Sequence, residues 1–487
     1  MPGLANSPMK IIQNIAQLAT CRADGGQGEI HPIADAALVW DGDTVVWVGP
    51  RREVPARYAS AEPLDAGGGV VIPGLVDCHT HLAFAGWRAE EFVERIEGRS
   101  YLEIARAGGG IARTVRLTRA ASEDELLERA QGFLQAMLRL GVTTVECKSG
   151  YGLDREHELG LLRVYRRLGE RQPIRLVPTF LGAHVVPPEF RGDRAGYLAL
   201  LEAMLPEVAE EGLARFCDAF VEESAYSPDE ARRLLRAAQR HGLGAKLHAD
   251  QLSAGGGAEL AAELGAVSAD HLECASPAGI EAMARAGVVA VSLPIATLYL
   301  GQVPFAARRW IAAGVPVAVA TDFNPGSAPS YHLPFALTLA CTLQRMTPAE
   351  ALKGATLYAA RAVGLADRIG SLEPGKAADI VLVRTDGLHG APMHDPVSWL
   401  VLHAGPADVD TVLVGGNVVK RGGRLEGVDV AAARRLVEDT RDRVVAELAP
   451  RGGLLPPEPD GWFDVTLQVM EAHLADARQP DEGDAAG

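Results

Sequence analysis

Two histidines one residue apart close an apolar stretch early in the chain. His79 and His81 stand in "GLVDCHTHLAF" (residues 74–84), with Thr80 between them. In a strand, residues i and i+2 point to the same side, so both imidazoles are expected to project together. Two imidazoles on one face can bind one metal ion at about 2.1 Å each. The alternative, two unrelated histidines, would crowd two polar rings in an apolar pocket.

Two further residues can complete this metal site. His248 in "KLHAD" and Asp322 in "VATDFNPG" also end apolar runs. Three imidazoles and one carboxylate leave a coordination position for water, which is a property of catalytic metal sites. Such a metal lowers the pKa of its water, and Asp322 can accept the released proton. Asp322 could instead be the N-cap of a helix opened by "TDFNPG".

Eight short apolar runs alternate with longer stretches of helical spacing from residue 71 onward. This alternation is typical of β-α-β units and a parallel sheet. The sequence therefore predicts an α/β protein built on a (β/α)₈ TIM barrel, although a doubly wound sheet shares the local pattern. The expected strands are residues 71–79, 142–150, 174–184, 214–222, 244–250, 265–271, 288–294 and 316–322.

Residues able to do chemistry stand at the carboxyl ends of these runs. They are His79, His81, Lys148, His184, Glu222, His248, His271 and Asp322. A lone buried histidine is more often a core residue, but in a barrel all these ends meet on one face, where the active site lies. The joint pattern therefore favours a barrel enzyme, and His271 is placed to polarise a carbonyl or stabilise an oxyanion.

Composition is that of an ordinary globular protein of 487 residues with a formal net charge of −16. That charge argues against a nucleic-acid or membrane-surface partner, since either favours a basic face. The apolar runs are shorter than a bilayer span, and the N-terminus lacks the features of a signal peptide, so a cytoplasmic location is expected. The six scattered cysteines are expected to be buried thiols.

Several motifs resemble those of one family. "PGLVDCHTHL", a histidine on the fifth strand, "DH" on the sixth and "TD" on the eighth are similar to the amidohydrolase superfamily. Within it, "HTHLAFAGWRAEEF", "ECKSGYGL", "FLGAHVVPPEF", "KLHADQLS" and "TDFNPGSAPS" resemble the imidazolonepropionase family, in order along the chain. The resemblance implies hydrolysis of 4-imidazolone-5-propanoate to N-formimidoyl-L-glutamate in histidine degradation, by a metal-activated water. It also implies a homodimer with one zinc or iron ion per site, since the ligand set suits both metals.

The resemblance assigns further residues to this small-molecule substrate. Arg88 would bind the propanoate carboxylate, for which a guanidinium is suited, whereas the alternative is a surface ion pair with Glu90 or Glu91. His184 would face the ring, while the two tyrosines would donate hydroxyl groups or pack at the rim. The remaining implied contacts, with those tyrosines, are Tyr101, Tyr151, Asn324, Gly326 and Ser327.

Two positions bear on the mechanism. Gln251 stands where some relatives carry a glutamate proposed to activate water. An amide cannot act as a base, so Gln251 is expected to orient substrate and Asp322 to remain the base. Lys148 lies on the second predicted strand, whereas binuclear amidohydrolases carry a metal-bridging lysine on the fourth. One metal ion is therefore expected.

The flanks of the barrel are expected to form a second domain. "AALVWDGDTVVWVG" (residues 36–49) is typical of antiparallel strands joined at Asp-Gly, and residues 368–425 show similar patterns. The resemblance implies that such segments combine into a small composite β-sandwich. The expected domains are residues 1–70 and 368–425 for the sandwich, 71–367 for the barrel, and 426–487 for a helical extension with an acidic, disordered end.

Two other functions stay open at this point. Another deaminase or cyclic-amide hydrolase of the superfamily would keep the metal-binding residues but should lack the "SGYG" and "LGAH" pair. A non-enzymatic binding protein on the same barrel would be expected to have lost ligands. Fold alone does not separate these possibilities.

Overall fold

The structure is a computed structural model, and it describes residues 9–99, 103–104, 107–426, 435 and 438. The chain divides into two compact units, residues 1–426 and 427–487, and everything reported below lies in the first. Two expectations fall outside the described residues. The first is the contact between Tyr101 and the substrate. The second is the C-terminal extension, of which only Glu426 and two isolated residues are described.

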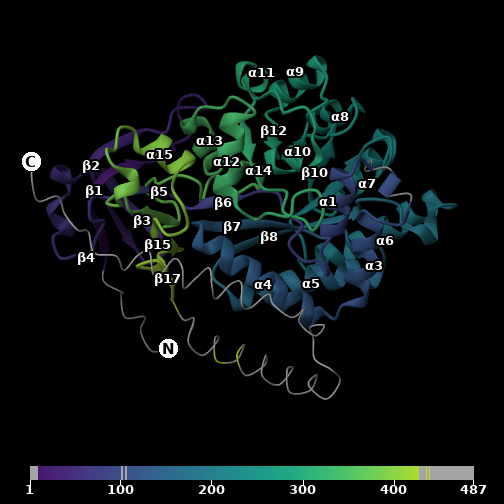
Figure 1. Cartoon of the computed structure of the whole chain (residues 1–487), viewed down its shortest axis with the longest axis horizontal. Helices are drawn as coiled ribbons and strands as arrows, with labels where there is room; N and C mark the ends of the chain where they lie inside the picture. Colours follow the sequence, from purple (N-terminus) through teal and green to yellow (C-terminus); the bar gives the residue numbers. More distant parts are fainter. Residues whose placement is uncertain (1–8, 100–102, 105–106, 427–434, 436–437, 439–487) are drawn as a thin grey trace, which may run out of the picture. The chain divides into compact units, whose positions relative to one another are not determined.

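A barrel of parallel strands, with the helices around it, forms the larger part of the described chain (Figure 1). Its eight described strands follow one another in chain order, each paired with the next. Backbone hydrogen bonds also join the first strand segment to the last, from Asp322 N to the His79 carbonyl at 3.1 Å and from His81 N to the Phe323 carbonyl at 2.8 Å. The sheet is therefore closed, which confirms the predicted (β/α)₈ barrel over the doubly wound alternative. Its strands are β6 (Leu75–Asp77), β7 (Val142–Lys148), β8 (Arg175–Ala183), β9 (Phe216–Val221), β10 (Gly244–Ala249), β11 (Ser268–His271), β12 (Val289–Ser292) and β13 (Val317–Val319).

Helices connect the strands and cover the outside of the barrel (Figure 1). Ser122 and Ser227 begin α4 and α7 with capping boxes, in which each serine and a glutamate three residues on satisfy free backbone N–H groups. The described helices are α1 (Ala89–Ile96), α3 (Ile111–Ala120), α4 (Glu123–Arg139), α5 (Arg155–Arg171), α6 (Arg194–Glu210), α7 (Pro228–Arg240), α8 (Gly257–Leu264), α9 (Pro277–Ala286), α10 (Pro294–Leu300), α11 (Ala307–Ala312), α12 (Leu333–Thr342), α13 (Pro348–Gly354), α14 (Leu357–Ala362) and α15 (Pro396–Leu402).

The stretch 71–79, expected to be one strand, is divided between two sheets. Val70–Pro73 forms β5 of a second sheet, and only β6 belongs to the barrel. Gly74 lies at the crossing, where an added Cβ would collide with the side chain of Thr143. Its N–H donates to the Asp379 carbonyl at 2.9 Å. The chain therefore passes between the sheets at a residue that must be small.

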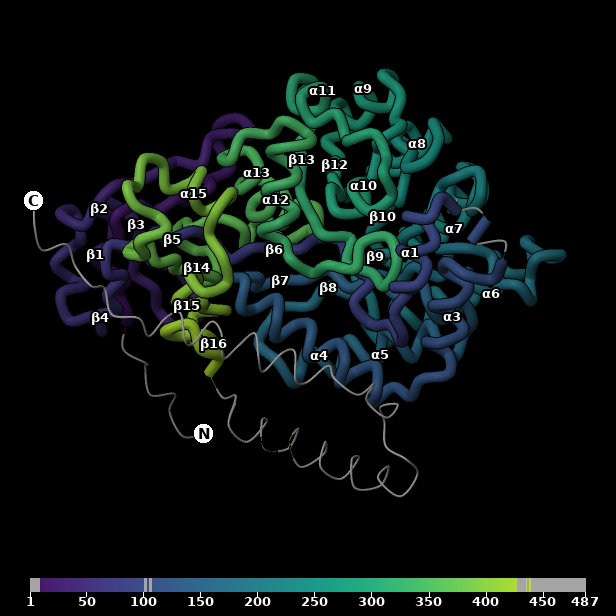
Figure 2. The backbone as a smooth tube through the Cα atoms, in the orientation of Figure 1, coloured from purple at the N-terminus to yellow at the C-terminus, as the bar shows by residue number. Residues whose placement is uncertain are grey.

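The second sheet combines strands from both ends of the described chain, as predicted. Figure 2 shows the N-terminal strands, in purple, beside the C-terminal strands, in green and yellow. Its strand order is β17-β16-β15-β14-β5-β1-β2-β3, with β4 paired to β1, and residues from both segments such as Trp40 and Leu413 share one core. The strands are β1 (Lys10–Ala19), β2 (Pro32–Asp41), β3 (Thr44–Pro50), β4 (Glu62–Asp65), β5 (Val70–Pro73), β14 (Ile380–Val383), β15 (Val409–Val414), β16 (Asn417–Arg421) and β17 (Arg424–Leu425).

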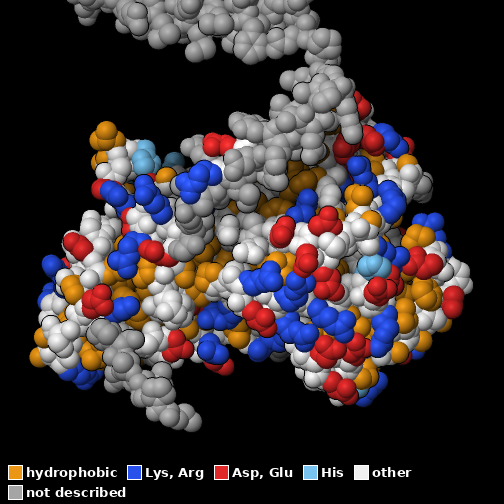
Figure 3. Space-filling model, turned by 90° about the horizontal axis from the view of Figure 1, so that it is seen from below, with side chains coloured by type: hydrophobic (Ala, Val, Ile, Leu, Met, Phe, Trp, Pro, Cys, Tyr) orange, Lys and Arg blue, Asp and Glu red, His pale blue; other side chains and the backbone are white. Residues whose placement is uncertain are grey.

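The surface carries charges of both signs. Figure 3 shows Lys and Arg side chains intermixed with Asp and Glu on the face seen from below. Neighbouring outer helices exchange ion pairs, such as Arg233 of α7 with Glu202 of α6. Among the described residues, no helix is both long enough and apolar enough to cross a membrane.

Candidate metal centre and active site

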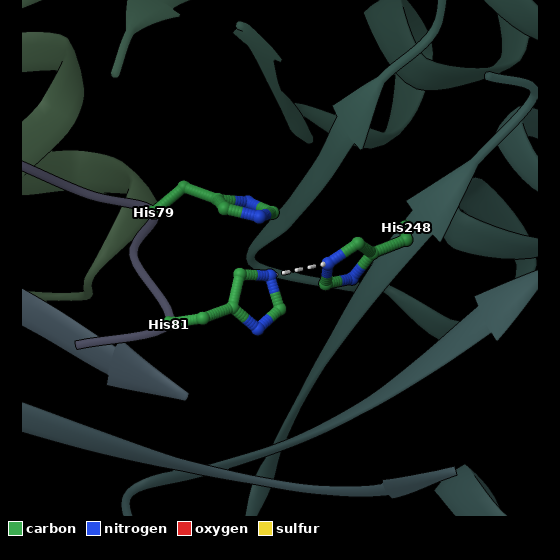
Figure 4. A group of neighbouring side chains, drawn as sticks. All are labelled: His79, His81 and His248. Carbon is green, nitrogen blue, oxygen red and sulfur yellow. Dashed lines mark hydrogen bonds between the residues drawn. The ribbon is translucent and has the colours of Figure 1, made fainter. Parts of the chain in front are cut away.

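Three histidines from two barrel strands converge at one end of the barrel. His79 and His81 follow β6, while His248 lies on β10, and Figure 4 shows their rings turned toward one another. One ligand nitrogen from each lies within 4.8 Å of the others. His81 Nε2 and His248 Nε2 are only 3.4 Å apart. The i, i+2 spacing thus brings both neighbouring imidazoles to the same point.

Asp322 joins this cluster from the end of the last strand. Its Oδ1 lies 3.3 Å from His79 Nε2 and 3.5 Å from His81 Nε2. Burial acts to raise the pKa of this carboxyl, but the neighbouring imidazoles outweigh burial and hold the pKa well below its ordinary value. The N-cap alternative is not what the structure shows, because the next helix begins only at Leu333, with His332 as its N-cap.

The donor set fits a divalent metal ion. His79 Nε2 is buried and has no hydrogen-bond partner among the described residues, although Asp322 lies nearby. The other ring nitrogen of His79, Nδ1, lies 2.6 Å from Asp270 Oδ2, which fixes the tautomer that leaves Nε2 free. Burial acts to lower the pKa of His79, but Asp270 and Asp322 outweigh it and raise the pKa to about 9, so without an ion Nε2 carries a proton that a bound metal would displace. A concentration of negative charge around an open imidazole nitrogen is suited to a cation.

His271 borders the same cluster from the end of β11. Its backbone is left-handed, with φ of 77°, which is uncommon outside glycine and is found at functional sites. One ligand atom each of His79, His271 and Asp322 also lie within 4.8 Å of one another. Burial lowers the pKa of His271 to about 3, so the ring is neutral and can donate a hydrogen bond from only one nitrogen.

A cavity of about 1260 Å³ opens above the cluster. Most of the substrate contacts expected from the sequence line it. Gly326 is placed beside it by its contact with Arg88, and Tyr101 lies outside the described residues. The lining includes His81, Arg88, Tyr151, His184, His248, Gln251, His271, Asp322, Asn324 and Ser327.

Arg88 is held at the wall of this cavity. Its side chain is 4% exposed, and its Nε lies 3.7 Å from Glu91 Oε2. Glu91 is one of the two partners expected if Arg88 formed only a surface ion pair. The pair is nevertheless buried, and Arg88 Nε and Nη1 have no hydrogen-bond partner among the described residues. Gly326 packs against the guanidinium so closely that a Cβ there would overlap it. A buried guanidinium with free donors is a site for an anionic group.

Tyr151, on the loop after β7, and His184, directly after β8, lie beside the metal cluster. The His184 ring stacks on that of His81 with centroids 5.1 Å apart, and its Nδ1 lies 3.0 Å from the Gly150 carbonyl. Glu158, fully buried at the start of α5, accepts N–H groups of the loop residues Gly150, Gly152 and Leu153 at 2.8–3.1 Å. The loop is therefore shaped by a carboxylate that the sequence reading missed.

Other site residues escaped the sequence reading because they lie inside the strands. Glu146, Asp218 and Asp270 are fully buried around Lys148 below the histidines. The sequence did contain a signal for these residues. An acidic residue within an otherwise apolar strand, as in "FCDAFV", needs a buried partner and therefore indicates a polar cluster. Glu222, expected at the active face, instead accepts N–H groups of Leu252 and Ser253 at 2.9 and 3.3 Å.

Comparisons with known proteins agree with this architecture. Residues 70–419 match the model of the Amidohydrolase family. An imidazolonepropionase of Geobacillus kaustophilus is 47% identical over 399 residues, which cover 81% of this chain and 92% of that protein. One of Anaeromyxobacter dehalogenans is 50% identical over 395 residues, covering 80% and 92%.

Solved structures share the fold at lower identity. A triazine hydrolase variant has a TM-score of 0.71 at 20% identity, covering 89% of this chain and 99% of its own. A zinc-bound adenosine deaminase from Xanthomonas campestris has a TM-score of 0.66 at 21% identity, covering 90% and 99%. At these identities the likeness concerns the fold alone.

Proposed function

Because this chain belongs to the amidohydrolase family and, within it, to the imidazolonepropionases, we propose that its cavity hydrolyses 4-imidazolone-5-propanoate. The product is N-formimidoyl-L-glutamate, an intermediate of histidine degradation. The reaction opens a cyclic amide, so it needs an activated water, a polarised carbonyl and a proton for the leaving nitrogen. The observation that carries the proposal is the convergence of His79, His81, His248 and Asp322, of which the last three line the cavity.

The metal ligands are His79, His81, His248 and Asp322. A bound zinc or iron ion would supply Lewis acidity, which lowers the pKa of a coordinated water. Asp322 has the further role of general base, because its carboxyl is ionised and lies beside the two imidazoles. His271, neutral and at the cavity wall, stabilises the negative charge that develops on the carbonyl oxygen.

The rest of the cavity binds and orients the substrate. Arg88 pairs with the propanoate carboxylate, since it lines the cavity and two of its guanidinium nitrogens have no hydrogen-bond partner among the described residues. Tyr151 and His184 lie beside the ring, and Gln251 donates or accepts through its amide without acting as a base. The turn after β13 completes the pocket. In it, Asn324 accepts the N–H groups of Gly326 and Ser327 at 2.9 and 2.8 Å.

The remaining proposals concern the metal, the assembly and the compartment. Three imidazoles and a carboxylate suit zinc and iron alike, and a structural neighbour was solved with zinc. A homodimer follows from the family resemblance, and sedimentation of the full chain tests it. A cytoplasmic location is supported by the six cysteines, all described and all unpaired, as is usual in a reducing compartment.

Metal analysis and activity on one preparation test the function. We expect about one zinc or iron ion per chain and turnover of 4-imidazolone-5-propanoate. Cyclic amides and aminated rings without a carboxylate tail serve as comparison substrates. Preferred turnover of such a ring would replace the proposal by another hydrolase or deaminase of the superfamily. Binding of 4-imidazolone-5-propanoate without turnover would indicate a binding protein.

A further inference from the structure

A buried ammonium group lies inside the barrel, below the metal cluster. Lys148 has no exposed side-chain surface, and its Nζ lies 2.7 Å from Asp218 Oδ2, 2.8 Å from Glu146 Oε1 and 3.4 Å from Asp270 Oδ2. Burial acts to lower the pKa of Lys148, but these carboxylates outweigh burial and hold it above its ordinary value. Lys148 is therefore charged, whereas carbamylation would need a neutral amine.

Two of these carboxylates also contact predicted metal ligands. Asp270 Oδ2 lies 2.6 Å from His79 Nδ1, at hydrogen-bond geometry. Asp218 Oδ2 lies 3.1 Å from His248 Nδ1 without hydrogen-bond geometry, while Asp218 Oδ1 accepts the backbone N–H of His248 at 3.1 Å. In both pairs, the oxygen that faces the imidazole is the oxygen that faces Lys148. One ammonium thus joins two carboxylate–imidazole pairs that come from different strands.

We propose that Lys148 is a positioning residue for the metal centre, which holds Asp218 and Asp270 so that His79 and His248 present Nε2 to the ion. The inference rests on the metal site of the proposed function. Without the ammonium, Asp218 would lose its only lysine partner among the described residues and Asp270 would keep only Lys246 at 4.0 Å, and a poorly compensated buried carboxylate is costly in a protein interior. Neither would then keep the position that orients its imidazole. Loss of such partners typically weakens metal binding by about 10- to 100-fold.

The chain offers a matched control in a second buried lysine. Lys246, on β10, also has no exposed side-chain surface, and its Nζ lies 3.8 Å from Glu146 Oε1 and 4.0 Å from Asp270 Oδ2. Its hydrogen bonds go to carbonyl oxygens instead, those of Ala362 at 3.1 Å and Cys78 at 3.4 Å. Lys246→Met removes the same charge from the same interior and leaves the Lys148 contacts in place.

The test measures Zn²⁺ binding to the metal-depleted full chain, by competition with a chelating dye. Lys148→Met should bind Zn²⁺ about 10- to 100-fold more weakly than the unchanged protein, and Lys246→Met should lose much less. The visible spectrum of the Co²⁺-loaded protein, which reports ligand geometry, should change more in Lys148→Met than in Lys246→Met, because only Lys148 contacts Asp218. Unaltered affinity in Lys148→Met, or equal losses in both variants, would overturn the proposal. An unchanged protein that binds no Zn²⁺ would contradict the proposed function instead.

A compensated variant covers the case in which Lys148→Met does not fold. Lys148→Met/Asp218→Asn removes one negative charge together with the cation and leaves an amide oxygen beside His248. This double variant should fold and bind Zn²⁺ more weakly than the unchanged protein. Binding at the unchanged affinity would overturn the proposal. Failure of the double variant to fold would do the same, because charge compensation would then not be what Lys148 supplies.

Discussion

The backbone N–H of Asp322 donates to the carbonyl oxygen of His79 at 3.1 Å, so two predicted metal ligands are joined at the seam of the barrel. The seam connects the first strand segment to the last, which are separated by about half of the sequence. An ion bound to both side chains would bridge the same seam a second time. Metal binding and barrel closure are therefore expected to support each other.

Removal of the metal should lower thermal stability as well as abolish turnover. A chelator is expected to reduce the melting temperature of the protein, because a ligand that binds only the folded state stabilises it. His248→Ala should remove both the ion and the activity. His241→Ala, at the exposed end of α7, is the matched control and should change neither. Stoichiometric metal with near-normal turnover in His248→Ala would refute the assigned ligand set.

Replacing the proposed base should separate catalysis from metal binding. Asp322→Asn keeps the shape of the side chain but loses the proton acceptor, so kcat should fall on the order of a hundredfold or more even where metal is retained. Gln251→Glu should stay folded and active. Metal content and kcat are measured on each preparation. Full activity in metal-loaded Asp322→Asn would place the base elsewhere.

Removing the Arg88 guanidinium should chiefly weaken substrate binding. A contact held equally in the ground and transition states raises KM more than it lowers kcat. Arg88→Met is expected to raise KM by roughly tenfold to a hundredfold, as for a charged hydrogen bond worth about 1.5 to 3 kcal/mol. Gly326→Ala should act in the same direction, since its Cβ would displace the guanidinium.

The control for Arg88 is a surface arginine of similar pairing. Arg113 lies 3.2 Å from Glu90, so Arg113→Met removes an ion pair at the surface and should leave KM unchanged. Metal content should be normal in all three variants. An unchanged KM in Arg88→Met would return that residue to a structural role.

Glu158 should support the loop that carries Tyr151. Glu158→Gln places an amide NH₂ against the backbone N–H of Gly150 whichever way the amide turns, because that N–H lies 2.9 and 3.1 Å from the two carboxylate oxygens, so two buried donors would face each other. The free energy of unfolding should fall by about 1 to 3 kcal/mol, the usual cost of an unsatisfied buried group, and KM should rise. The control is Glu156→Gln, the same substitution at an exposed position of the same helix. Denaturant unfolding and steady-state kinetics decide the outcome; equal behaviour of the two variants would contradict this role.

The barrel and the histidine cluster could be predicted because their signals are periodic. Alternating apolar runs and helical stretches define the strands, and a strand's two-residue period places His79 and His81 on one side. Topology then brings His248 and Asp322 to the same end, where the structure has them.

The division of residues 71–79 could not be predicted in this way. Both halves are buried and, apart from Asp77, apolar, so hydrophobicity does not distinguish β5 from β6. What separates them is the close approach of Thr143 to Gly74, a contact between residues far apart in the sequence. Glu158 was missed for a similar reason, because its partners are backbone N–H groups, which leave no trace in side-chain spacing.

The crossing at Gly74 also affects the order in which the protein can be assembled. One edge of β5 pairs with β1, which leaves the ribosome first, but the other edge pairs with β14, at Ile380–Val383. During synthesis, that second edge stays open until all eight barrel strands have been translated, because β14 follows β13 in the sequence. β5, which precedes β6 and His79, is therefore paired on both edges only late in synthesis. The strand that completes this pairing belongs to the same C-terminal segment that completes the second sheet.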